Sequence, residues 1–519
     1  MPTRQTTYRQ LHEQLTKARQ LDDTRTRQAR SGEIIHPSKV GQTIANMYEQ
    51  LRNAAELADD NIALQRAIKR FYKRTLFITH YKFDRVGQEL LIELILSGYI
   101  QEGSVGEHAT QMITELVTRH AGLYRTLRSA DITQKKAMNW TLAVLSVKTY
   151  NLLLPDMQDL VTTGYCFEYF YEELPSDTFI ETEIEKDMYR DALYVATHQA
   201  LQRSDIDAVR TYLLEAHTLD GTDLVEYIHW NNYTDELYTA PLTLRLRRAI
   251  SRNGAPFRVL RSLVLSKPPL ETFTNRDLFL QAYNAQIQGE LARLNKRLNT
   301  GIIKSIIFLL ITKVIIGLGV EVPFDLYMYD AIAAIPLTIN LLFPPLYMAS
   351  IRLGLTMPSA QSAQRTTNFI DDLLFSTTAP TPKLPRKPSK RKRARLGYAI
   401  LFPVPFVITY FILNALHFNP LQMVIFIMFF STASFLGYRL SLMVRELRMV
   451  ASESSVYSIL RDLFYLPYIL LGQWLAGRYA QINVIGQVLD LIIELPLKTV
   501  LSLIRQWIHF LNERHDELY

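Results

Sequence analysis

The sequence predicts an all-α protein with a cytoplasmic helical bundle, a multi-span α-helical membrane domain and C-terminal amphipathic helices. The first ~300 residues carry helical periodicity, and no run there alternates apolar and polar residues between hairpin turns. After Gly301 the chain contains long stretches with almost no charge. The 519 residues include only 20 glycines, which argues against strand-dense folds and Gly-rich phosphate loops. The mean hydropathy of +0.01 therefore averages two unlike halves.

The N-terminal half divides into a polar, basic segment at residues 1–32 and a cytoplasmic all-helical domain at residues 33–298. Ser204 reads as an N-cap, with Asp207 three residues later, and Gly221 follows the end of that helix. A second helix carries Met138 to Leu152 on one stripe and stops at Pro155. A third is predicted to begin near Val40. Short helices of this kind with apolar stripes are typical of a bundle.

Two transmembrane hairpins are predicted, at residues 301–351 and 396–444. Ile302–Val320 is 19 residues long and carries Lys304 and Lys313, and the 21 residues of Ala331–Ile351 carry no charge. Leu396–Val444 has one charged residue, Arg439, and a break at His417–Pro420 that divides it into two spans. Each span of about 20 residues is long enough to cross ~30 Å of hydrocarbon. We therefore expect four transmembrane helices.

The charges predict the orientation of these spans. Lysine and arginine precede the first span, follow the second and follow the fourth, whereas the two remaining loops contain none. Because basic residues mark cytoplasmic loops, both termini should face the cytoplasm of a cell (inner or plasma) membrane.

The loop at residues 352–395 is predicted to be a cytoplasmic Pro/Lys/Arg-rich linker. Eight basic residues gather there, more than the net charge of +7 of the whole chain. They favour a signal that fixes membrane topology, and capture of anionic lipid headgroups is the functional alternative. Nucleic-acid binding is a further and less favoured alternative, and tethering between two spans argues against nuclear targeting. The residues are Lys383, Arg386, Lys387, Lys390, Arg391, Lys392, Arg393 and Arg395.

Lys313 near the middle of the first span is the candidate intramembrane polar site. An ammonium at that depth needs a polar partner, water or a route to the interface along which it can snorkel. Asn340 in the second span is the main candidate partner, and Thr338, Ser431, Thr432 and Ser434 are others. We expect no carboxylate in any span.

Four prolines are predicted to kink the second and third spans. Pro344 and Pro345 lie in the second span, and Pro403 and Pro405 in the third, at similar depths from the cytoplasmic side. Carbonyl groups freed at such breaks can coordinate a solute or cation. Two ordinary kinked helices shaped to pack together are the favoured explanation, because proline is common in membrane helices.

The last segment, residues 452–519, is predicted to form membrane-associated amphipathic helices. Phe464–Gly477 is uncharged for 14 residues and contains Pro467, so it is too short to span by itself. Beyond it, polar residues from Asp490 to His509 recur every three or four positions on an otherwise apolar helix. These helices could instead form further spans.

No catalytic or metal site is predicted, and no cofactor. The single cysteine, Cys166, lies among aromatic residues and reads as a core thiol. His80 with Asp84, and the acids from Glu181 to Asp191, would suit a metal only if the fold brought them together. The motifs of P-loops, dinucleotide folds and zinc proteases do not occur.

These observations favour a non-enzymatic, membrane-anchored scaffold whose cytoplasmic helical domain docks a soluble protein partner. The alternative is a transporter or channel subunit with a solute path near Lys313 and the prolines of the second and third spans. Four spans are few for such a path, so that alternative would require assembly with a second copy of the chain. A membrane-bound enzyme is the third hypothesis.

Overall fold

The computed structural model describes residues 4–34, 60–76, 83–331, 333–354, 360–376, 380–382, 401–446 and 456–481. Every regular element in these ranges is a helix, which confirms the predicted all-α class. The described residues fall into two compact units, which we treat separately. Unit 1 contains Met1–Ile250 and Val264–Leu270, and unit 2 contains Ser251–Leu263 and Glu271–Asn483.

Unit 1 is built from short helices that pack on one another. In chain order these are α1 (Arg4–Ala29), α3 (Asp60–Thr75), η1 (Phe83–Arg85), α4 (Val86–Leu96), α5 (Glu107–Ser129), α6 (Gln134–Leu153), α7 (Met157–Glu173), η2 (Ser176–Thr178), α8 (Glu183–Thr197), the π-helix η3 (His198–Gln202), α9 (Ile206–Ala216), α10 (Leu224–Thr239) and α11 (Pro241–Asn253). The predicted helix near Val40 lies outside the described residues.

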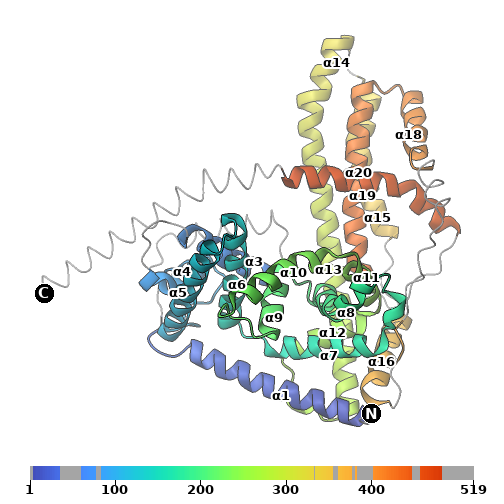
Figure 1. Cartoon of the computed structure of the whole chain (residues 1–519). Helices are drawn as coiled ribbons and strands as arrows, with labels where there is room; N and C mark the ends of the chain where they lie inside the picture. Colours follow the sequence, from blue (N-terminus) through green and yellow to red (C-terminus); the bar gives the residue numbers. More distant parts are fainter. Residues whose placement is uncertain are drawn as a thin grey trace, which may run out of the picture. The chain divides into compact units, whose positions relative to one another are not determined.

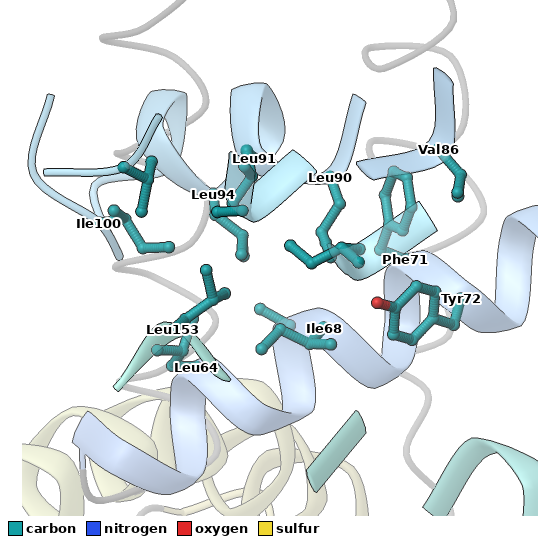
Figure 2. Close-up of a cluster of buried hydrophobic side chains, with 14 of the residues drawn as sticks. Leu64, Ile68, Phe71, Tyr72, Val86, Leu90, Leu91, Leu94, Ile100 and Leu153 are labelled. Atoms are coloured by element: carbon teal, nitrogen blue, oxygen red, sulfur yellow. The ribbon is translucent and has the colours of Figure 1, made fainter. Parts of the chain in front are cut away.

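A hydrophobic core joins α3, α4, α5 and α6 (Figure 2). Ile68 and Tyr72 of α3 and Leu90 of α4 are fully buried in it. The Tyr72 hydroxyl lies 2.8 Å from Thr149 Oγ1 on α6, so its polar end is satisfied inside the core. The apolar stripe of α6 that the sequence reveals is therefore a packing surface.

The N-cap of α9 differs from the prediction by one residue. Asp205, and not Ser204, caps the helix, and its carboxylate accepts a hydrogen bond from Ala208 N at 3.0 Å. Both side chains are good caps, so spacing alone could not decide between them. Arg203, two residues before Asp205, has a left-handed backbone conformation with φ 57°, because the π-helix η3 ends there.

Unit 2 contains the long apolar helices (Figure 1). Its elements are α12 (Ala255–Leu265), η4 (Leu270–Phe273), α13 (Arg276–Ile316), the π-helix η5 (Gly317–Glu321), α14 (Val322–Tyr329), α15 (Ala334–Gly354), α16 (Ala360–Phe375), α18 (Val404–Ala415), α19 (Pro420–Glu446) and α20 (Val456–Gln481). α11, α12 and η4 each cross the border between the two units.

Among the residues that the structure describes, three helices are long and apolar enough to cross a membrane, whereas the sequence predicts four. They are Arg276–Tyr329, Ala334–Arg352 and Pro420–Val444. The remaining predicted span contains the 12-residue helix α18, which is too short by itself, and the residues before Leu401 lie outside the described ranges.

The first of these helices is longer than predicted at both ends. α13, η5 and α14 run continuously from Arg276 to Tyr329, through the expected domain boundary at residues 298–301 and past the expected end of the span at Val320. Apolar residues are exposed along one stripe of α13, as a lipid-facing surface requires. The stripe consists of Ile303, Ile307, Leu310, Ile311, Val314 and Ile315.

The segment after the second span is not an extended linker throughout. α16 (residues 360–375) lies within it and packs on α13, where Thr367 Oγ1 donates to Asn284 Oδ1 at 2.6 Å. Arg276 donates two hydrogen bonds to the carboxylate of Asp371, both at 2.7 Å. The second span is therefore followed by a helical stalk.

α20 packs across α19 (Figure 1). A Cβ atom at Gly472 would meet the carbonyl oxygen of Ser431 at 2.1 Å, so only glycine allows the two backbones to approach so closely. Tyr468 is fully buried beside this contact, and its hydroxyl donates to Pro405 O at 2.9 Å. The uncharged stretch from Phe464 is thus a packing face of α20.

Candidate functional site

The candidate site is a network of buried charged and polar side chains among the apolar helices of unit 2. Lys313 of α13 forms an ion pair with Glu321 of η5, and the side chains are 1% and 0% exposed. The Lys313 Nζ also lies 4.9 Å from the ring centroid of Phe429. The structure thus gives Lys313 an acidic partner, and the expectation that no span contains a carboxylate is wrong. Glu321 directly follows Val320, the end of the first span that the sequence predicts.

The π-helix η5 explains how two residues eight positions apart can pair. In a regular α-helix, eight residues at about 100° each place the second side chain about 80° away from the first. A π-turn accommodates one extra residue, which leaves seven α-helical steps, about 700° or nearly two full turns. Lys313 and Glu321 therefore face the same side of one continuous helix.

Asn340 of α15 joins the network from the second span. Its Nδ2 donates to Glu321 Oε2 at 3.1 Å and to the backbone carbonyl of Gln422 at 3.3 Å. Both partners are acceptors, so the amide presents Nδ2 to them and its orientation is fixed. Among the described residues Oδ1 has no hydrogen-bond partner, although Asn340 is 0% exposed.

Asp325 of α14 is held by the N-terminus of α19. Asn419 and Gln422 form a reciprocal capping box there, with Asn419 Oδ1 accepting from Gln422 N at 2.8 Å and Gln422 Oε1 from Asn419 N at 3.2 Å. Their free amide hydrogens point to Asp325, at 2.6 Å from Asn419 Nδ2 and 2.9 Å from Gln422 Nε2. Asp325 thereby fixes the end of α14 to the start of α19.

We call these six residues the charge network. It consists of Lys313, Glu321, Asp325, Asn340, Asn419 and Gln422. They come from three helices within residues 313–422. The Gln422 side chain donates to Asp325, and its carbonyl accepts from Asn340, which also donates to Glu321. The network combines one ammonium with two carboxylates, so its fully ionised form carries a charge of −1.

The four prolines occupy two different kinds of position. Pro344 and Pro345 lie inside α15, four and five residues after Asn340. Pro403 is the N-cap residue of α18 and Pro405 lies in its first turn, so these two begin a helix. Proline is well tolerated in a first turn, where no intrahelical donor is needed.

The polybasic run from Lys383 to Arg395 lies outside the described residues, as does His80. The acids of α8 have partners in unit 1. Arg245 donates to Glu185 Oε1 at 2.6 Å, and Asp191 accepts from the Tyr233 hydroxyl at 3.0 Å. Within the described ranges no three His, Cys, Asp or Glu side chains are grouped so that they could hold a metal ion.

Unit 1 also carries a surface cluster of aromatic and imidazole side chains. The rings of His217 and Trp230 stack at 3.7 Å between centroids, and Tyr233 lies edge-on to Trp230 at 5.4 Å. His229 stacks on Tyr233 at 6.1 Å, and Val225, one turn earlier on α10, is 79% exposed. We call these five residues the aromatic surface.

Sequence reasoning missed most of the charge network. The Asn-Pro-x-Gln pattern at residues 419–422 is a readable capping signal that overlaps the predicted break at His417–Pro420. Glu321 and Asp325 lie beyond the predicted end of the first span at Val320, because a 3.6-residue period does not reveal the π-turn. The structure brings the predicted residues Lys313 and Asn340 together through Glu321, whose carboxylate accepts a hydrogen bond from each of them.

Comparisons with protein-family models, with curated proteins and with solved structures found no match for this chain.

Proposed function

We propose that the chain is a multi-pass membrane protein whose apolar helices anchor a helical docking domain at the cytoplasmic surface. The observation that carries this proposal is the closure of the charge network. Lys313 and Glu321 satisfy each other while 1% and 0% exposed. Their surroundings are packed side chains such as Leu309 and Phe429, both buried. A closed interior of this kind suits an anchor.

The aromatic surface supports docking by unit 1. Tryptophan, tyrosine and similar side chains are enriched among the residues that dominate protein–protein binding energy. Val225 adds exposed apolar area to this surface, at 79%. Exposed apolar side chains beside aromatic rings are typical of interaction sites.

The orientation is part of the proposal. With both termini in the cytoplasm, unit 1, the stalk formed by α13 and α16 and the polybasic residues 383–395 lie on the same side of the membrane. The basic residues would then contact anionic headgroups, at about 1 kcal/mol for each one near the surface.

Site-specific photocrosslinking in native membranes tests the docking proposal. A crosslinking residue is placed in the full-length chain at His229, with Gln111 as a matched exposed control on α5. We expect one reproducible partner that crosslinks from position 229, does not crosslink from position 111, and is lost with Trp230→Ala. No such partner, or equal capture from both positions, would contradict it.

A transporter or channel subunit is the second candidate, and it is favoured by the charged residues and the π-turn in the apolar helices. π-turns are frequent at functional sites, and intramembrane charges often line solute paths. The test is flux of candidate ions and solutes in vesicles that contain Lys313→Met or the native chain. A flux that the substitution abolishes would favour transport over anchoring.

A further inference from the structure

We propose that the charge network binds one small monovalent cation, either a proton or an alkali-metal ion such as Na⁺. The first step is a count of charges. Lys313 contributes one positive charge, and Glu321 and Asp325 contribute two negative charges, so the network carries −1 when all three are ionised. All three side chains are almost completely buried.

An uncompensated charge in an apolar interior is costly, because it has lost its hydration. The N-terminus of α19, which Asp325 faces, supplies about +0.5 of a charge through its backbone amides. Asn419 and Gln422 donate neutral hydrogen bonds to Asp325 and add no charge. This dipole offsets only part of the formal charge of −1, so the network stays negative and would attract one monovalent cation.

The second, independent observation is the carbonyl oxygen of Asn340. This Oδ1 has no partner among the described residues, and its orientation is fixed because Nδ2 donates to Glu321 and to the Gln422 carbonyl. Carboxylate and amide oxygens are the ligands that hard cations prefer. A cation beside Asn340 would satisfy this oxygen and balance the charge at the same time.

Other charged groups lie away from the network in the described structure. Asp330, at the end of α14, and His417, before α19, are exposed. Arg352 at the far end of α15 bonds to Asn295 and Asn299, and Arg439, toward the other end of α19, is exposed. None of these described neighbours supplies the missing charge.

Two measurements on the full chain in nanodiscs of a zwitterionic lipid separate the two sources of charge. Binding of radioactive ²²Na⁺ at fixed pH measures an alkali-metal ion. Infrared difference spectra across pH, in buffer without alkali-metal ions, measure a protonated carboxyl group. We expect one cation per chain in one of the two measurements.

The variants change the charge of the network in known steps. Asp325→Asn and Glu321→Gln each make it neutral, so either one should abolish the bound cation. Asp330→Asn removes the same charge from an exposed position of the same helical hairpin and should leave binding unchanged. Lys313→Met removes the ammonium and changes the charge of the network from −1 to −2, so it should increase binding to two cations.

The proposal is overturned if the native chain binds a cation in neither measurement, or if Asp330→Asn lowers binding as much as Asp325→Asn. If both neutralising variants fail to fold, Asn340→Leu still decides, because it keeps every charge and removes the unpartnered oxygen. Unchanged binding by that variant would contradict a site at Asn340.

Discussion

The two units each contain a buried basic side chain paired with an acid, but in different surroundings. In unit 1, Arg210 is 4% exposed and pairs with Asp235, which is 39% exposed and so keeps contact with water. In unit 2, Lys313 and Glu321 are 1% and 0% exposed. The Arg210 guanidinium also donates to the carbonyl and side chain of Asn231, at 3.0 and 2.9 Å.

This difference determines what happens when a partner is lost. If Asp235 is removed, Arg210 still donates to the carbonyl and the side chain of Asn231. If Glu321 is removed, Lys313 has no described acceptor, and its charge must be neutralised or rehydrated. The same type of pair should therefore be far more important in unit 2 than in unit 1.

The largest expected effect comes from Glu321→Leu. Leaving one partner of a buried pair uncompensated costs about 3–5 kcal/mol of unfolding free energy. The double variant Lys313→Met, Glu321→Leu removes both charges and should recover most of that loss. Thermal unfolding in nanodiscs measures the stability of both variants. A double variant no more stable than Glu321→Leu would show that the uncompensated Lys313 charge is not the cause of the loss.

A pH effect is expected in unit 1, from His120. Its side chain is 4% exposed, and burial lowers its pKa from 6.5 to about 4, with Leu116 O accepting from Nδ1 at 2.8 Å. Above pH 6.5 the stability that unit 1 gains by holding His120 in its neutral form is fully present. Between pH 6.5 and 4 the unfolded chain binds a proton that the folded chain does not, so unit 1 should lose up to about 3 kcal/mol.

Urea unfolding followed by circular dichroism at several pH values checks this effect. His120→Leu should flatten the pH dependence between 6.5 and 4. His108→Leu is the control, because His108 is exposed on the same helix. An equal flattening by both variants would show that His120 is not the source.

A smaller effect is expected where α20 crosses α19. Gly472→Ala places a Cβ atom 2.1 Å from the Ser431 carbonyl oxygen, so the helices must separate, at a cost of roughly 1–3 kcal/mol. Gly319→Ala is the control, because a Cβ there meets nothing within 4 Å. Hydrogen exchange of α20 should accelerate in the first variant, and equal exchange in both would disprove the close contact.

The smallest effect is expected from Asp235→Asn. The side chain at position 235 is partly exposed to water, and Arg210 keeps Asn231 as an acceptor. We therefore expect the unfolding free energy to fall by only about 1 kcal/mol. Urea unfolding of the full chain measures it. A loss as large as that of Glu321→Leu would show that exposure does not distinguish the two pairs.

The sequence predicts the parts of this fold that depend on local patterns. The apolar stripe of α6, its end before Pro155 and the apolar character of α15 and α19 follow directly from residue spacing. Lys313 and Asn340 were selected because a polar side chain in an apolar span requires a partner.

The rest of the fold depends on three-dimensional geometry that the spacing of apolar residues does not reveal. The π-turn at Gly317–Glu321 moves Glu321 by one position and extends the helix to Tyr329, so a residue assigned to a loop becomes the partner of Lys313. The amides of Asn419 and Gln422 reach Asp325 only because α14 and α19 meet in space. That contact is tertiary, and α16 within the predicted linker shows the same limit.

Water access to the interior of unit 2 tests the central claim, that the charge network is closed, most directly. Cysteine is placed at Leu309 or at Ser431, both 0% exposed, in a Cys166→Ala background, with Tyr327→Cys as the 87% exposed control. We expect a small water-soluble thiosulfonate reagent to label position 327 and neither interior position in intact vesicles. Labelling at 309 or 431 as fast as at 327 would contradict a closed anchor and indicate a water-filled path.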